Sequence, residues 1–280
     1  MSKPKNEADA VKTETRFDKK FYGLRARKKH AFVPFVVLGD PDFDTSFEII
    51  KTLVASGADA LELGFAFSDP IADGPVIQEA DQRALASGAD TDKNFALLKK
   101  IRGLDAEIPI SLLVYSNLIV QCGFDAFYEK CADCGVDAVL ASDVPVEEAA
   151  PFLAAAKKHG VNQIFLVTPN ETDARLKKIL AVSSGYVYVV AVLGITGARD
   201  SVQSMTRGLL QKLRKKTSLP LLVGFGISRP EHVREVIASG ADGAIIGSAI
   251  VKKIAENLSD REMMLRGLKE FASGLKTASL

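Results

Sequence analysis

The chain has 280 residues, of which 47% are hydrophobic and 25% are charged, and its formal net charge is +1. This length is enough for one large α/β domain with a sizeable core. The near-neutral charge gives no electrostatic reason to expect binding to nucleic acid or membrane, and no run reaches the roughly 18 apolar residues that span a bilayer. The first residues are polar and lack a signal peptide's apolar centre, so we expect a cytoplasmic protein with a disordered tail over residues 1–15.

The three cysteines, Cys122, Cys131 and Cys134, argue against a disulfide framework because their number is odd. Cys131 and Cys134 form a C-x-x-C pair, but the pair falls in a segment with helical spacing. The sequence has no second such pair, and its histidines are scattered. We therefore expect reduced thiols and no metal site.

The elements alternate regularly along the chain. The first predicted helix covers residues 16–27 and places Phe17, Phe21 and Leu24 on one face, which suits a plug over one end of a barrel. Apolar strands are predicted at 31–38, 60–65, 108–117, 135–143, 162–169, 185–193, 219–227 and 240–249. Amphipathic helices are predicted between and after them at 45–56, 76–87, 93–104, 124–134, 147–159, 171–181, 202–215, 230–238, 250–257 and 262–277.

Strands that alternate with helices and lack hairpin signals favour a closed (β/α)8 TIM barrel. The alternative, a doubly wound open sheet, should carry a G-x-G-x-x-G turn after an early strand, and nothing near Gly39 or Gly64 matches it. We predict one barrel domain over residues 16–280, with an N-terminal capping helix and extra helices. In such a barrel the chemistry lies at the C-terminal ends of the strands.

Glycine clusters end the last three predicted strands as G-I-T-G, G-F-G and G-S. Glycines let backbone N–H groups converge on an anion, and phosphate binding after strands seven and eight recurs in this fold. Ser248 heads a short helix whose dipole would also favour a dianion. A single cluster would indicate only a tight turn, but three at consecutive strand ends favour a phosphate site.

Glu62 lies in an apolar strand, where a carboxyl group is costly unless it is paired, protonated or used. Its neighbours on the same face, Ala60 and Gly64, are small and would leave room for a ligand. A structural ion pair is the alternative, but none of the predicted strands carries Lys or Arg. Asp69 and Asp73 follow in a turn-rich loop, so the region holds carboxyl groups in different environments that can serve as acid and base.

Aromatic and aliphatic residues on or near the strands could line an apolar slot for a flat ring, or could form core layers of the barrel. Both interpretations stay open for Phe35, Leu113, Tyr115, Tyr188 and Phe225.

Several motifs together resemble the tryptophan synthase α chain over about residues 16–275. These are F-V-P-F-V-V-L-G-D-P, L-E-L-G-F-A-F-S-D-P-I-A-D-G-P-V-I-Q, D-V-P-V-E-E, G-I-T-G, G-F-G-I-S and I-G-S-A-I-V. The resemblance implies a lyase that cleaves indole-3-glycerol phosphate to indole and glyceraldehyde 3-phosphate by a retro-aldol reaction in tryptophan biosynthesis. It also implies a β chain as partner in an α2β2 heterotetramer. The pyridoxal phosphate belongs to the β chain, so no cofactor is expected in this chain.

The resemblance assigns roles to individual residues. It implies that Glu62 and Asp73 are the two catalytic acids and that Asp69 belongs to a loop facing the partner. The residues that it and the apolar slot place around the substrate are Phe35, Tyr115, Tyr188, Thr196, Gly197, Phe225, Gly226, Gly247 and Ser248. Among these, Gly197, Gly226, Gly247 and Ser248 would hold the phosphate, and Thr196 would reach Asp73 when the loops close.

This sequence departs from the family pattern at residues that we expect to affect closure of the loops over the site. Ala66 stands where the family usually has Pro, which should loosen the loop of Asp73, and Ala191, Val192 and Leu193 replace residues that are often polar. The N-terminal tail is also longer than the fold requires. One alternative function is therefore a catalytically weak α chain that mainly activates its β partner. Another is a phosphosugar isomerase or epimerase, but the catalytic Lys, His or metal ligands typical of those enzymes are not found at the strand ends.

Overall fold

The computed structural model describes residues 14–190 and 199–280, apart from the side chains of residues 199–204. Nine parallel strands lie in these ranges, in the order β5-β4-β3-β2-β1-β9-β8-β7-β6. Their bounds are β1 Ala31–Val37, β2 Leu61–Gly64, β3 Ile110–Val114, β4 Ala138–Ala141, β5 Asn162–Gln163, β6 Leu166–Val167, β7 Val187–Val190, β8 Leu221–Gly224 and β9 Gly243–Ile246.

The first and last strands of this order are two halves of one segment, so the sheet closes on itself. Only residues 164 and 165 separate β5 from β6; the N–H of Ile164 donates to Val139 and the carbonyl of Phe165 accepts from Tyr188. The predicted (β/α)8 barrel is thus confirmed. The prediction of one continuous strand over 162–169 was wrong, because the segment changes neighbour there from β4 to β7.

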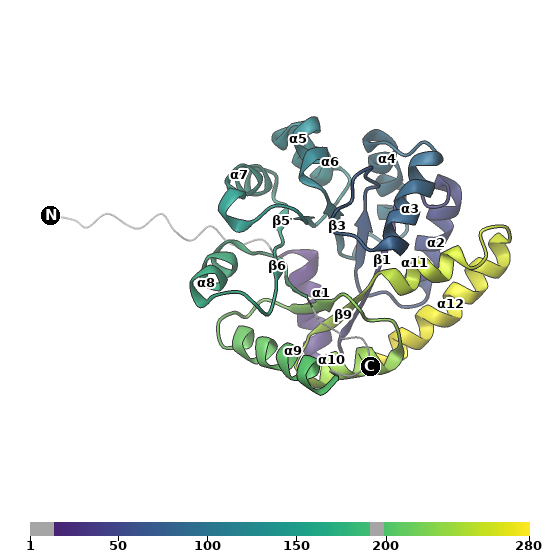
Figure 1. The fold of residues 1–280 in the computed structure, drawn as a ribbon. Helices are drawn as coiled ribbons and strands as arrows, with labels where there is room; N and C mark the ends of the chain where they lie inside the picture. Colours follow the sequence, from purple (N-terminus) through teal and green to yellow (C-terminus); the bar gives the residue numbers. More distant parts are fainter. Residues whose placement is uncertain (1–13, 191–198) are drawn as a thin grey trace.

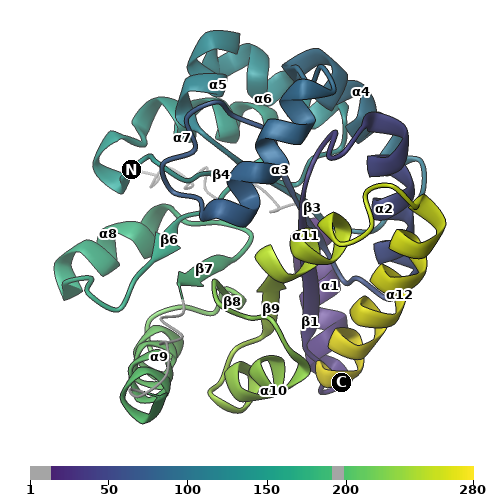
Figure 2. The same cartoon turned by 45° about the vertical axis from the view of Figure 1, so that its right-hand side comes forward.

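Helices surround the strands, as Figure 1 and the turned view in Figure 2 show. Their bounds are α1 Arg16–Ala26, α2 Phe43–Ala55, α3 Pro75–Ala86, α4 Thr91–Arg102, α5 Ser116–Cys122, α6 Phe124–Asp133, α7 Ala150–His159, α8 Asp173–Val182, α9 Arg199–Arg214, α10 Pro230–Ala238, α11 Ser248–Ala255 and α12 Arg261–Ala278, with a 3₁₀ turn η1 at Val146–Glu148. The sequence did not predict α5, because seven residues are too short to show a helical period. Among the described helices, none is long and apolar enough to cross a membrane.

Polar caps explain where several helices begin. The Asp42 side chain accepts the backbone N–H of Thr45, so α2 starts two residues before its predicted first residue. Thr15 and Asp18 form a reciprocal capping box at α1. Thr15, which the sequence assigned to the tail, therefore helps to fix the first helix.

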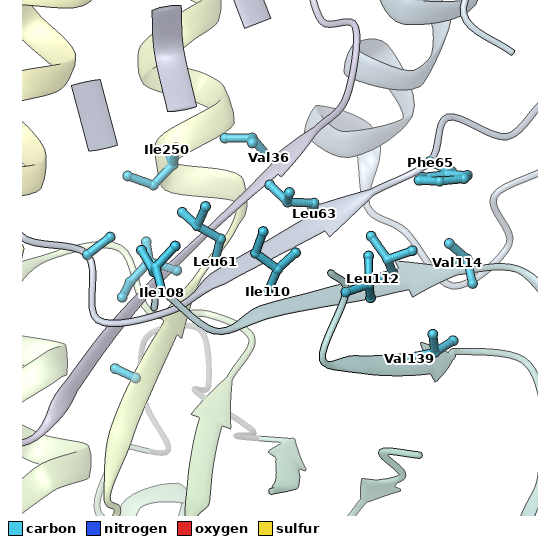
Figure 3. Close-up of a cluster of buried hydrophobic side chains, with 14 of the residues drawn as sticks. Val36, Leu61, Leu63, Phe65, Ile108, Ile110, Leu112, Val114, Val139 and Ile250 are labelled. Atoms are coloured by element: carbon cyan, nitrogen blue, oxygen red, sulfur yellow. The ribbon is translucent and has the colours of Figure 1, made fainter. Parts of the chain in front are cut away.

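The strands separate two apolar cores. Along β1, Val33 and Phe35 point into the barrel, whereas Phe32 and Val36 pack outward against the helices. Figure 3 shows part of the outer core, where aliphatic side chains from β1 to β4 meet Ile250 of α11.

Helix α1 closes the inner core, as its predicted role as a plug requires. Phe17, Phe21 and Leu24 are buried in the inner core. Arg16 pairs with Asp137 at 2.9 Å and Arg25 with Asp242 at 3.1 Å, next to the N-terminal ends of β4 and β9. The plug therefore covers the N-terminal end of the barrel and leaves the C-terminal end for a site.

Candidate active site

A cavity of about 280 Å³ opens at the C-terminal ends of the strands. Predicted site residues from both the first and the second half of the chain line this cavity. Its lining consists of Phe35, Glu62, Asp73, Ile77, Leu113, Tyr188, Phe225, Gly226, Ile227, Ser228, Ile245, Gly247, Ser248 and Ala249. Size and apolar walls with a few polar groups are typical of a small-molecule site.

Glu62 lies on β2 in register with Phe35 of β1 and Ser111 of β3, and only 1% of its surface is exposed. The hydroxyl of Tyr186 donates to its Oε1 at 2.9 Å. Burial raises the pKa of Glu62 to about 8, against a smaller lowering by that hydrogen bond. No ion pair to Glu62 occurs within the described ranges, and the raised pKa favours the protonated form of this carboxyl group near neutral pH.

We expected a ligand to use the space beside Gly64, but the side chain of Phe35 fills that space. A Cβ at Gly64 would lie 2.8 Å from the Phe35 ring. Glycine is needed here because the ring of the neighbouring strand packs directly against the backbone. The ligand space lies further out, where Phe35 itself lines the cavity.

Asp73 reaches the cavity from the loop between β2 and α3. The hydroxyl of Tyr115 donates to Asp73 Oδ2 at 2.6 Å and accepts the backbone N–H of Ala72 at 3.0 Å. The Gln78 side chain also donates to the carbonyl of Asp73 at 2.8 Å. Burial raises the pKa of Asp73, and the Tyr115 hydrogen bond partly offsets this rise. Two carboxyl groups with different partners thus face one cavity.

Tyr115 supports Asp73 instead of lining the cavity with Phe35, Tyr188 and Phe225. The ring of Tyr115 stacks on Phe67, which lies on the loop that carries Asp73, with 5.1 Å between the ring centroids. The hydroxyl therefore holds the loop of Asp73 in place on the side away from the cavity. The sequence found this tyrosine by its position after a strand but could not show which way it points.

A glycine-lined cradle closes the other side of the cavity. Phe225 and Gly226 have positive φ angles of 68° and 74°, which turn the chain after β8 toward the cavity. Gly247 precedes α11, and the first two residues of that helix, Ser248 and Ala249, line the same wall. Amide groups at a helix N-terminus are unpaired within the helix, so this wall suits an anion such as phosphate.

Several predicted residues lie apart from the cavity or outside the described ranges. Thr196 and Gly197 belong to residues 191–198, as do Ala191, Val192 and Leu193. Asp69 is exposed on the loop, next to Ile71, whose side chain is 86% exposed. Ala66 is buried in the inner core, and its loosening effect stays a prediction.

Sequence reasoning did not single out Ile77, Ser228 and Ile245, which also line the cavity. Ser228 belongs to the quoted G-F-G-I-S motif, so its position beside the glycine cluster was an available signal. Asp81, a buried carboxyl on α3, was missed because helical periodicity does not distinguish a buried acid from a solvated one.

The C-x-x-C pair is separate from this site. Cys131 and Cys134 are buried in the outer core, and both are free thiols. Burial raises the pKa of both thiols, so neither is activated as a thiolate.

The fold and the cavity define the class: a (β/α)8 barrel whose cavity has a buried acid at one wall and a glycine-lined wall after the last two strands. The family model that describes the tryptophan synthase alpha chain matches residues 21–280. The chain belongs to this family.

Individual relatives agree with the family match. A tryptophan synthase alpha chain from Methanothermobacter thermautotrophicus is 54% identical over 248 residues, which cover 89% of this chain and 92% of the relative. One from Actinobacillus pleuropneumoniae is 50% identical over 266 residues, covering 95% and 99%. The crystal structure of the Legionella pneumophila alpha subunit matches with a TM-score of 0.87 at 34% identity, covering 94% of this chain and 98% of that one.

Proposed function

We propose that this chain carries out its family's reaction with Glu62 as the proton donor. The alpha reaction cleaves indole-3-glycerol phosphate to indole and glyceraldehyde 3-phosphate, so the chain is a carbon–carbon lyase of tryptophan biosynthesis. The single observation that supports the assignment of roles is that Glu62 is buried and lines the same cavity as Asp73; burial raises the pKa of Glu62 to about 8.

Glu62 acts in two steps of the proposed mechanism, first as a proton donor and then as a proton acceptor. Its proton first goes to C3 of the indole ring, which gives an indolenine whose bond to the glycerol carbon can break. The resulting carboxylate then accepts the proton of the hydroxyl on that carbon, as the electrons of the broken bond return to the ring. Glu62 ends protonated, so the cycle balances without a metal. The raised pKa of about 8 supports a donor that is protonated at neutral pH.

Asp73 would hold the indole N–H and stabilise the positive charge that develops on the protonated ring. This role needs an ionised carboxylate at a fixed position. The hydrogen bond from Tyr115 supports both requirements, because it favours the charged form and holds the side chain in place. The rings of Phe35, Tyr188 and Phe225 would form the apolar slot for indole.

The phosphate would lie against Gly226, Gly247 and Ser248, with Ser228 as an added donor. We expect Ser248→Ala to raise KM about tenfold with little change in kcat, because one hydrogen bond to a charged group is lost at a site remote from the breaking bond. Steady-state kinetics measure this. An unchanged KM would contradict this place for the phosphate.

We also propose a partner and a compartment. A tryptophan synthase complex from Pyrococcus furiosus matches with a TM-score of 0.79 at 35% identity, covering 88% of this chain and 98% of that one. By analogy, a β chain that carries pyridoxal phosphate would bind this chain in an α2β2 heterotetramer. The exposed loop with Asp69 and Ile71 is the proposed contact, and the cytoplasm is the proposed compartment.

The test is indole release from indole-3-glycerol phosphate by the purified chain, measured with and without a β chain. We expect release by the chain alone and faster release with the partner. No indole under either condition would overturn the lyase assignment. It would favour the alternative of a catalytically weak chain that activates its partner.

A further inference from the structure

Ser111 is a buried polar residue of β3 to which the proposed mechanism gives no role. It is the register partner of Glu62 on β2, and only 1% of its surface is exposed. The Ser111 hydroxyl donates to the carbonyl of Leu61 at 3.2 Å. The Tyr186 hydroxyl lies 3.3 Å from Ser111 Oγ and 2.9 Å from Glu62 Oε1. A chain of hydrogen bonds therefore runs through the barrel interior from Glu62 to the backbone of its own strand.

The Tyr186 hydroxyl has one proton and two possible acceptors. Ser111 uses its own proton on Leu61, so its oxygen has lone pairs for Tyr186. An ionised carboxylate is the stronger acceptor, so Tyr186 donates to Glu62 Oε1 when Glu62 is charged. A protonated carboxyl group accepts more weakly, and with its proton on Oε1 it donates to the Tyr186 oxygen instead. The Tyr186 proton then needs another acceptor, which the described residues provide in Ser111.

Among the described residues, the groups around this chain of hydrogen bonds supply no cation. Tyr188 on β7 and Asp73 on the loop are the titratable side chains that share the cavity with Glu62. Burial raises the pKa of Tyr188 well above its ordinary value, so its hydroxyl stays neutral, and Asp73 receives its own hydrogen bond from Tyr115. Burial and the charge of Glu62 likewise raise the pKa of Tyr186 and keep it neutral. The neighbours from β1 and α1 are apolar: Phe35 and Phe17.

We propose that Ser111 is a positioning residue that acts through Tyr186 by accepting the tyrosine proton while Glu62 is protonated. When Glu62 gives its proton to the substrate, the Tyr186 O–H turns from Ser111 to Glu62 Oε1 and stabilises the new carboxylate. When Glu62 takes up the proton of the substrate hydroxyl, the O–H turns back. Tyr186 and Ser111 keep their own protons throughout, so the proton balance of Glu62 is unchanged. The proposal rests on the proposed function, because it gives Glu62 a hydrogen-bond partner in both of its states.

The expected signature is a pair of opposite shifts in the alkaline limb of kcat/KM, which reports the pKa of the proton donor. Burial raises the pKa of Glu62 to about 8, and the hydrogen bond from Tyr186 lowers it. Ser111→Ala removes an acceptor that supports the protonated state, so the limb should move to lower pH by about half a unit. Tyr186→Phe removes the donor to the carboxylate, so the limb should move to higher pH.

Two control variants separate this role from loss of packing. Ser111→Thr keeps the hydroxyl and should keep the wild-type limb. Ser46→Ala removes a hydroxyl that is also 99% buried and accepts the N–H of Gly39 away from the cavity, so it should leave the limb unchanged. A merely structural Ser111 would leave the limb of Ser111→Ala at its wild-type position. That result would overturn the proposal, as would a shift in the same direction as that of Tyr186→Phe.

A second measurement does not depend on turnover. With ¹³C-labelled glutamate carboxyl groups, NMR should show one glutamate that titrates near pH 8 in the wild type and is absent in Glu62→Gln. Its midpoint should fall in Ser111→Ala, or in Ser111→Gly if the alanine variant does not fold, and rise in Tyr186→Phe. Glu79→Gln removes an exposed glutamate and should leave the midpoint unchanged.

An equal midpoint in the wild type and in the variants without the Ser111 hydroxyl would overturn the proposal even if indole is released. Failure to release indole would overturn the proposed function instead, and the titration would still decide whether Ser111 acts on Glu62.

Discussion

At the scale of single residues, Glu62 is kept at a cost to stability. Its folded pKa of about 8 exceeds the ordinary value of 4.5, because burial disfavours the charged form. Between these two values the folded state binds more protons than the unfolded state. Stability therefore falls as pH rises from about 4.5 to about 8 and levels off above that range. A group that weakens the fold at neutral pH is consistent with a functional role.

We expect Glu62→Gln to raise the free energy of unfolding by about 4 kcal/mol at pH 7.5 and by about 1 kcal/mol at pH 5. Glutamine has no charge to bury, and its carbonyl can still accept the hydrogen bond from Tyr186. Urea denaturation at the two pH values measures the difference. Equal gains at both pH values would contradict a raised pKa, and Glu79→Gln should show no gain at either.

At the scale of elements, the connection from β2 to α3 determines how the site is assembled. Strand β2 fixes the position of Glu62. Asp73 lies on a loop, and the hydrogen bond from Tyr115 holds its side chain in place. This tyrosine follows β3, so a neighbouring strand positions the loop. The expected loosening by Ala66 would act on the same loop, and within the described residues the hydrogen bond from Tyr115 restrains the Asp73 side chain there.

We expect Tyr115→Phe to lower kcat about tenfold with little change in KM, because a hydrogen bond to a charged group is lost and Tyr115 does not line the cavity. The acid limb of the pH profile should also move to higher pH, since the hydrogen bond lowers the pKa of Asp73. Tyr128→Phe removes a buried hydroxyl bonded to Gln163, away from the cavity, and is the control. Equal kinetics in the two variants would contradict the role of Tyr115.

At the scale of the whole molecule, the barrel interior links the plug to the site. Phe17 of α1 packs on Tyr186, with 5.3 Å between ring centroids, and Tyr186 donates to Glu62. A single aromatic side chain thus connects the N-terminal end of the barrel with the acid at its mouth. The plug helps to exclude water from Glu62, which is the cause of its raised pKa.

Much of this arrangement could be predicted from the sequence, because alternating apolar strands and amphipathic helices report burial directly. Glu62 and Gly247 were found as exceptions to that pattern. The break between β5 and β6, the direction of Tyr115 and the burial of Asp81 depend on which neighbours the chain meets after folding. Periodicity carries no information about such partners, so these features became visible only in three dimensions.

The decisive measurement is the turnover of Glu62→Gln with indole-3-glycerol phosphate. Removing the proton donor should lower kcat by a factor of about 100 or more, as expected for loss of a general acid. Affinity for glycerol 3-phosphate should stay unchanged, because the cradle at Gly226, Gly247 and Ser248 is intact. A kcat within a few-fold of the wild type would show that Glu62 is not the proton donor.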